Sequence, residues 1–248
     1  MGLSDFIPVI IPYLNIHKEK YQEIIASLGL TEPIIIEKYP LKSEWRKDLA
    51  NAVASRVGDK KSLIFGERHY LITYCYNDSH TALITFDAHN DSFPLEKRLL
   101  YDEEISNDIS NGDFLLQRKG ETHIIGTRIK SDVPRIKTYP PRKRKAYKLL
   151  KDQIPNKIFL SLEIDVFDPE ITQAHYYPHD SIIDEVAKFF GYRRFLNFEE
   201  CCELSISLIR NREVVGINIA GYAPECEGPP FKTVELIKEY LNRISPYL

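Results

Sequence analysis

The most informative stretch of this chain is Thr85-Phe86-Asp87-Ala88-His89-Asn90-Asp91. It follows the apolar run Thr81-Ala82-Leu83-Ile84, which is typical of a buried strand. Because an extended backbone sends alternate side chains to the same side, we expect Asp87, His89 and Asp91 to converge where the strand leaves the sheet. Taken alone, the stretch is also compatible with a polar loop after a buried strand.

A second stretch, Ile158-Phe159-Leu160-Ser161-Leu162-Glu163-Ile164-Asp165-Val166-Phe167-Asp168-Pro169, repeats this arrangement. We expect Glu163 and Asp165 to point the same way from one extended strand. Pro169 prevents continuation as a central strand. Two strand ends that both present carboxylates repel each other in a dry cleft unless cations lie between them. The two stretches together therefore predict a metal site.

On these stretches the chain resembles the arginase (ureohydrolase) superfamily. Asp87-Ala88-His89-Asn90-Asp91 is similar to the family's Asp-Ala-His-x-Asp. Ser161 to Asp165, with Asp168-Pro169, is similar to its Ser-x-Asp-x-Asp-x-x-Asp-Pro. The resemblance implies a three-layer α/β fold with a mostly parallel central sheet flanked by helices. It covers about residues 61 to 245, so we expect a single domain of residues 1–248 with a divergent part, residues 1–60.

The composition excludes several classes of protein. A chain of 248 residues with 43% hydrophobic content is long enough for one sizeable core. The net charge of -3 gives no general attraction to nucleic acid or to an anionic membrane. No apolar run reaches the roughly 18 residues of a spanning helix. Four cysteines without Cys-x-x-Cys spacing fit reduced thiols, and we expect a cytoplasmic protein whose oligomeric state the sequence leaves open.

The rest of the chain alternates between strand and helix patterns, which favours a parallel sheet. Strands are expected near residues 6–13, 34–36, 62–66, 121–125 and 213–224, and helices near residues 18–28, 44–55, 196–204 and 233–241. The run Pro141 to Lys148 carries five cations. We interpret it as the solvated face of a crossover helix, and a docking patch for an acidic peptide or protein is the alternative.

The resemblance implies two manganese ions and six ligands. These ligands are His69, Asp87, His89, Asp91, Glu163 and Asp165. His69 ends Gly66-Glu67-Arg68-His69, where the family has Gly-Gly-Asp-His; a histidine that is only hydrogen-bonded is the alternative. A set of oxygen ligands with two imidazoles suits manganese. Glu163 stands where the family has aspartate, and its extra methylene shifts the carboxylate by more than a bond length.

Two residues besides the ligands, Asn111 and Glu200, are assigned to the substrate and the reaction. Ser110-Asn111-Gly112-Asp113-Phe114-Leu115 resembles the family's Ser-His-Gly-x-Phe-Leu, with Asn111 in place of the histidine. Asparagine can position a substrate but cannot shuttle a proton, and a helix N-cap is the alternative role. Glu200, by resemblance to Leu-Thr-x-Arg-Glu, would bind a guanidinium through paired hydrogen bonds; a surface glutamate is the alternative. His89 is also expected to face the substrate.

The implied activity is hydrolysis of a guanidino group to an amine and urea. Asp165 would help to stabilise the tetrahedral intermediate. The sequence has no recognisable pocket for a free amino acid. Its differences from the family motifs resemble those of atypical arginases that convert arginine to ornithine within a peptide. Free arginine, agmatine or another small guanidino compound is the nearest rival substrate. The sequence also leaves open a non-catalytic metal-binding scaffold or regulatory relative, and an amide deacetylase with one metal ion.

Overall fold

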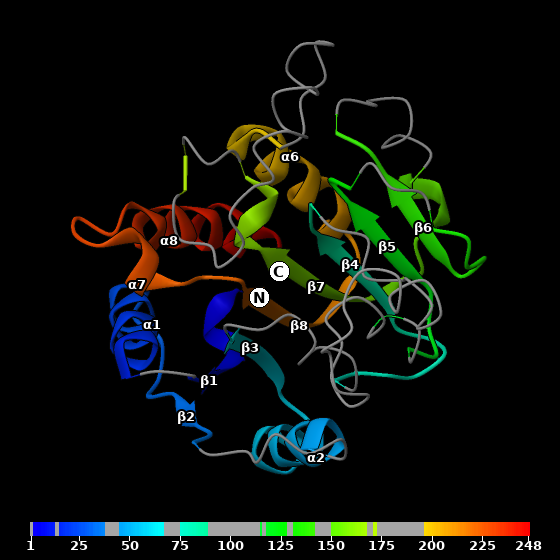
Figure 1. Ribbon diagram of the computed structural model, residues 1–248. Coiled ribbons are helices and arrows are strands. Elements are labelled where there is room, and N and C mark those ends of the chain that lie inside the picture. Colours follow the sequence, from blue (N-terminus) through cyan, green and yellow to red (C-terminus); the bar gives the residue numbers. More distant parts are fainter. Residues whose placement is uncertain are drawn as a thin grey trace, which may run out of the picture.

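The computed structural model describes residues 2–12, 15–37, 45–66, 75–88, 115, 118–127, 131–141, 150–167, 171–172 and 196–248. Its centre is an eight-stranded sheet in the order β2-β1-β3-β8-β7-β4-β5-β6 (Figure 1). The strands are β1 (Phe6–Ile11), β2 (Ile34–Ile35), β3 (Lys61–Gly66), β4 (Ala82–Phe86), β5 (Thr122–Ile125), β6 (Ile136–Tyr139), β7 (Lys157–Glu163) and β8 (Glu213–Ala220). Every pairing between them is parallel.

Helices cover both faces of this sheet. They are α1 (Asn15–Ser27), α2 (Trp45–Val57), α6 (Phe198–Ile209), α7 (Pro224–Glu227) and α8 (Lys232–Ile244), with the short 3-10 turns η1 (Leu3–Asp5), η4 (Ile164–Val166) and η5 (Ser245–Tyr247). On one face, α1, α6 and α8 bury their apolar side chains against β3, β8, β7 and β4. On the other, Val53 and Val57 of α2 join a second cluster with Ile64 and Phe159. The predicted three-layer α/β fold is confirmed.

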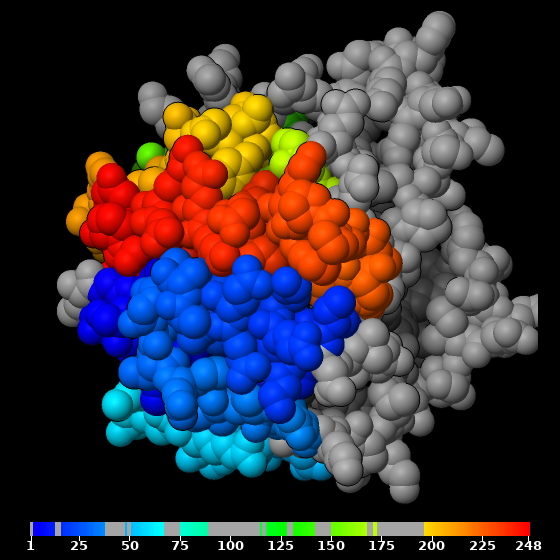
Figure 2. Space-filling model, turned by 90° about the vertical axis from the view of Figure 1, so that its left-hand side faces the viewer, coloured from blue at the N-terminus to red at the C-terminus, as the bar shows by residue number. Residues whose placement is uncertain are grey.

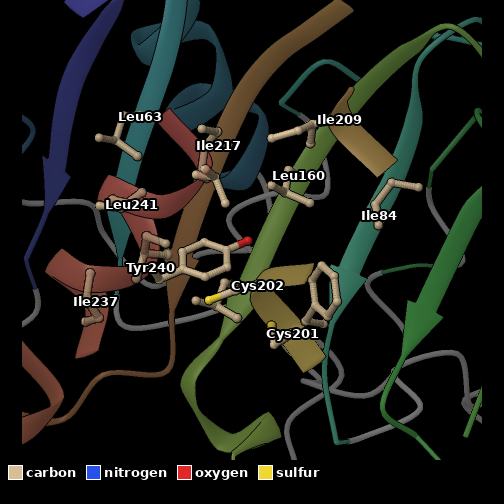
Figure 3. Packing of buried hydrophobic residues seen from close by; sticks show 14 of the residues in the cluster. Leu63, Ile84, Leu160, Cys201, Cys202, Ile209, Ile217, Ile237, Tyr240 and Leu241 are labelled. Atoms are coloured by element: carbon tan, nitrogen blue, oxygen red, sulfur yellow. The ribbon is translucent and has the colours of Figure 1, made fainter. Parts of the chain in front are cut away.

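The core on the α8 face shows why α8 forms where the sequence predicts it. Its buried residues include Val234, Ile237, Tyr240, Leu241 and Ile244, which recur at the spacing of one helical face. Figure 3 shows Ile237, Tyr240 and Leu241 in one cluster with the strand residues Leu63, Ile217 and Leu160. The burial of this stripe fixes the helix on the sheet.

The first 60 residues, which resemble the family least, join the same sheet. β1 pairs in parallel with β3 along its whole length, and β2 extends the edge. α1 packs beside α8, as Figure 2 shows in blue and red, and Lys238 Nζ lies 3.3 Å from the Glu23 carboxylate across that contact. The divergent part therefore supplies two strands and two covering helices, α1 on one face and α2 on the other.

Most predicted elements are confirmed, with shifted ends. β8 ends at Ala220 rather than Pro224, because Gly221 adopts a φ of 73° that breaks the extended backbone. Glu44, the predicted first residue of α2, lies outside the described residues. β6 was not predicted. In the part of the chain that the structure describes, no helix is both long enough and apolar enough to span a bilayer.

A β-bulge lies between β7 and β8. Ile158 pairs with Val214, but the next residue, Phe159, pairs with Gly216, so Val215 is the extra residue. A Cβ atom added at Gly216 would lie 2.7 Å from Cε2 of Tyr76 and 3.2 Å from the ring of Phe159. Only glycine therefore fits at this point of the bulge.

We expect Gly216→Ala to lower the free energy of unfolding by about 1 to 3 kcal/mol, the usual range for overpacking a core. The added methyl group meets two aromatic rings that are themselves packed against each other, 5.1 Å between centroids. Urea denaturation measures the change. Gly2→Ala is the matched control, because a Cβ there meets nothing closer than 3.5 Å. Equal stability of both variants would contradict this packing argument.

His123 is a buried histidine on β5. Its Nδ1 lies 3.2 Å from the Tyr139 hydroxyl, and its Nε2 lies 3.5 Å from the Glu121 carboxylate. Burial, helped by the positive charge of Lys137, lowers the pKa of His123 to about 4, although Glu121 acts in the opposite direction. The imidazole is therefore neutral at pH 7.

This depressed pKa makes the protein sensitive to acid. Between pH 6.5 and about 4 the unfolded chain binds a proton at this histidine and the folded chain does not, so the free energy of unfolding falls as the pH falls. The loss from this one group is of the order of 3 kcal/mol at most. His123→Phe keeps a ring beside Tyr139. We expect its free energy of unfolding, measured by urea denaturation, to decrease less than that of the wild type between pH 7 and pH 4.5. An unchanged slope would contradict this assignment.

Candidate metal site

Two residues with buried carboxylates occupy neighbouring backbone positions at the carboxyl edge of the sheet. Phe86 and Leu162 form the last pair between β4 and β7, so Asp87 and Glu163 follow one step further at the same level. The Asp87 N–H donates to the carbonyl of Ile125, 2.9 Å away, which continues the ladder past the end of β4. Asp87 is 0% and Glu163 1% exposed. The structure thus brings together one predicted ligand from each of the two motifs.

Asp165 is also buried, at 8% exposure, but its backbone differs from the prediction. β7 ends at Glu163, and the next three residues form the 3-10 turn η4, closed by a hydrogen bond from the Phe167 N–H to the Ile164 carbonyl. The prediction that Glu163 and Asp165 leave one extended strand is wrong. Glu163 pairs with Ala220, where β8 ends, so an extended chain beyond Glu163 would have no strand to pair with on that side.

Glu163 is held closely by its own strand and by the end of β8. The Ser161 hydroxyl donates to Oε1 of Glu163 at 3.3 Å. On the other side, a Cβ atom at Gly221 would lie 3.7 Å from Oε2 of Glu163. This is an ordinary van der Waals separation, so the φ of 73° at Gly221, and not a lack of space beside the carboxylate, favours glycine at this position.

Gly126 packs directly against the backbone of Asp87. It follows β5 with a φ of 115°, and a Cβ atom there would lie 2.9 Å from the Asp87 carbonyl oxygen and 2.6 Å from Cγ2 of Val166. A side chain at this point would push β5, Asp87 and η4 apart. The sequence indicated a strand near residues 121–125, but this close packing after its end could not be inferred from it.

Glu200 lies in the first turn of α6, which starts at the same edge of the sheet. Leu196 pairs with Phe167 in an isolated parallel bridge, and the Leu196 N–H donates to the Val166 carbonyl at 2.9 Å. Asn197 then caps the helix, accepting from the Glu199 N–H at 2.8 Å. Glu200 is half-buried, whereas Glu199 is exposed and paired with Arg243. The guanidinium role of Glu200 stays a prediction.

The other predicted site residues lie outside the described residues. They are His69, His89, Asp91 and Asn111. Within the described ranges alone, no group of three or more His, Cys, Asp or Glu side chains converges as a metal site requires. The six-ligand arrangement therefore stays a prediction, as does the crossover helix predicted for the run Pro141 to Lys148. The pair formed by Asp87 and Glu163 fits a divalent cation, because hard cations prefer oxygen ligands and offset the repulsion between neighbouring carboxylates.

A second buried polar cluster, not found by sequence reasoning, joins α1 to α7. Nε2 of His17 lies 3.0 Å from the Glu225 carboxylate, and the His17 side chain is fully buried. Burial lowers the pKa of His17, and Glu225 opposes that effect. Tyr21 packs against Phe65 and Tyr222 next to this pair. The residues are more than 200 positions apart, so no local pattern indicates the contact.

Comparison with known proteins establishes the class of fold. No protein-family model matches the sequence. No curated protein matches it either. Solved structures do match along nearly the whole chain. The agmatine ureohydrolase of Thermoplasma volcanium superposes with a TM-score of 0.69 at 17% identity, covering 98% of this chain and 90% of that one.

Two further solved structures are similar to the same extent. Formimidoylglutamase from Bacillus subtilis has a TM-score of 0.68 at 14% identity and covers 100% of this chain and 89% of its own. The arginase from Bacillus subtilis has a TM-score of 0.68 at 16% identity, with coverages of 96% and 98%. This chain therefore has the arginase-like α/β fold that ureohydrolases share. The finer resemblance to peptide arginases stays a prediction.

Proposed function

We propose that this protein is a metal-dependent hydrolase that converts a guanidino group to an amine and urea. One observation carries the proposal: Asp87 and Glu163 lie buried and adjacent at the carboxyl edge of the central strands. In open α/β sheets this edge is where ligands bind. Fold similarity alone would not specify an activity, and these two carboxylates come from the motifs that resemble the ureohydrolases.

The proposed ligand set combines the described carboxylates with three residues outside the described part. Asp87, Glu163 and Asp165 would hold two manganese ions together with His69, His89 and Asp91. Divalent ions in such a site acidify a water and stabilise negative charge as it develops. The protein's own part is to hold the carboxylates in place. Burial of Asp87 and Glu163 strengthens their attraction for a cation, because little water screens it.

Recognition of the substrate is assigned to Glu200, with Asn111 and His89. A guanidinium is planar and permanently charged, and a carboxylate can accept two parallel hydrogen bonds from it. The start of α6 is tied to η4 through Leu196, which supports placing Glu200 on the side of the sheet where the carboxylates lie. Asn111 would position the substrate by hydrogen bonds and would not transfer a proton.

Arginine within a peptide is the substrate we propose. The sequence contains no recognisable set of polar residues for the α-carboxylate and α-amine of a free amino acid. The similar structures are an agmatine ureohydrolase, a formimidoylglutamase and an arginase, so the fold by itself does not select one substrate. Free arginine and agmatine are therefore the rival substrates to test.

The test is urea release by the manganese-loaded protein, with an arginine-containing peptide, free arginine and agmatine offered in parallel. Urea from the peptide, with ornithine found in the peptide by mass spectrometry, is the expected result. The same peptide with lysine in place of arginine is the control and should release none. Urea from free arginine or agmatine alone would keep the reaction and change the substrate. No urea from any of them, with metal bound, would favour a non-catalytic role.

A further inference from the structure

A row of polar side chains crosses the middle of the sheet, one pleat below the carboxylates. Asn218 of β8 pairs with Ser161 of β7, and Ser161 pairs with Thr85 of β4. All three are buried. Central parallel strands are normally apolar because both of their faces are covered. The flanking residues of the same row, Ile64 and Ile124, follow that rule.

The row is connected to the candidate metal site by hydrogen bonds. Nδ2 of Asn218 donates to the Ser161 hydroxyl at 3.0 Å, and that hydroxyl donates to Oε1 of Glu163 at 3.3 Å. A hydroxyl can accept one hydrogen bond and donate another, so the chain has a direction that ends on the carboxylate. Oδ1 of Asn218 is buried and finds no hydrogen-bond partner within the described ranges. A buried polar atom without a partner costs free energy, so an apolar residue would stabilise the fold more than Asn218 if packing were its only role.

The β-bulge at Val215 is what aligns the two residues. Before it, Ile158 pairs with Val214; if that register continued, Ser161 would pair with Ile217. A slip of one residue also turns every side chain to the opposite face. The bulge therefore puts Asn218, and not an isoleucine, beside Ser161.

We propose that Asn218 and Ser161 are positioning residues that fix the Glu163 carboxylate for metal binding. This depends on the manganese site of the proposed function. The hydrogen bond from Ser161 to Oε1 fixes the rotation of the carboxylate. Asn218 donates to the Ser161 oxygen and so orients the hydroxyl hydrogen toward Glu163. Oε2 lies on the side of Gly221, where a Cβ atom would be 3.7 Å away. The polar chain thus compensates for the freedom that the longer glutamate side chain would otherwise have.

The experiment compares Ser161→Ala and Asn218→Leu with the wild-type protein by titration calorimetry with manganese alone. We expect affinity for one of the two ions to fall about 10- to 100-fold, as is usual when a partner of a ligand is removed. Ser161→Thr, which keeps the hydroxyl, should retain the wild-type affinity. Ser205→Ala is the matched control: Ser205 is buried and pairs with the Tyr240 hydroxyl at 2.9 Å, on the α6 and α8 side. It should lose stability but not affinity.

Unchanged affinity in folded Ser161→Ala would overturn the inference, even if Asn218→Leu fails to fold. A wild-type protein that binds no manganese would also overturn it, because Glu163 would then have no metal to hold. If manganese binds and the variants weaken it while no substrate yields urea, the inference stands and the proposed reaction fails. The two failures are therefore distinguishable.

Discussion

Asp87→Asn is expected to lower urea release by about a thousandfold or more. The substitution keeps the shape of the side chain and removes the negative charge at a fully buried position. A neutral amide is a much weaker ligand for a hard cation, and a loss of about 4 kcal/mol in transition-state stabilisation corresponds to a thousandfold in rate. Manganese binding should weaken in parallel, as measured by titration calorimetry.

Asp78→Asn is the matched control for this experiment, since Asp78 lies before the opposite end of β4. Its carboxylate accepts hydrogen bonds from the N–H groups of His80 and Thr81, both at 2.8 Å, and from the Thr81 hydroxyl. Asp78→Asn should therefore cost about 1 kcal/mol of stability and leave urea release and manganese binding unchanged. Wild-type activity in Asp87→Asn would show that the motif around Asp87 is only a structural loop.

Glu163→Gln is expected to remove most of the stabilisation that manganese gives the folded protein. A ligand that binds only the folded state at a hundred times its Kd stabilises it by about 2.7 kcal/mol. For a chain of this size, such a change raises Tm by about 5 to 10 °C. The glutamine keeps the length of Glu163 but not its charge. The difference in Tm with and without manganese should therefore be much smaller in this variant than in the wild type.

Glu163→Asp separates charge from length at the same position. It keeps the carboxylate and restores the residue that the family has there. Manganese should still raise its Tm, in contrast to Glu163→Gln. Tighter binding with intact activity would show that the glutamate is tolerated rather than required. If manganese raised Tm equally in the wild type and both variants, Glu163 would not be a ligand.

The sequence predicted the elements whose patterns are local. β4 and β7 are apolar runs that end in charged motifs, and α8 has one apolar face, so their positions follow from short-range periodicity. β6 was missed because Lys137 and Thr138 are only half-buried at the edge of the sheet, which leaves no apolar run. The positions of Asp87 and Glu163 followed from strand ends, which parallel pairing brings to one edge.

Other features depend on contacts that no local pattern encodes. Glu163-Ile164-Asp165-Val166 alternates like a strand, so the 3-10 turn could not be distinguished from an extended segment. The bulge lies in Val214-Val215-Gly216, where every residue is apolar or glycine. The sequence there has no alternation of polar and apolar residues that would indicate the change of register. It depends on how Gly216 packs against Phe159 and Tyr76. The link from Asn218 to Glu163 follows from that register and was therefore invisible in the sequence.

The place of β8 in the sheet has a consequence for how the chain folds. β8 is hydrogen-bonded to β3 on one side and to β7 on the other, although it is the last strand in the sequence. During synthesis the other seven of the eight strands leave the ribosome first, and they can form only two separate half-sheets. Each half-sheet has an unpaired inner edge, which is a template for wrong pairing. Folding is therefore expected to be completed late and to depend on protection of the nascent chain until β8 inserts.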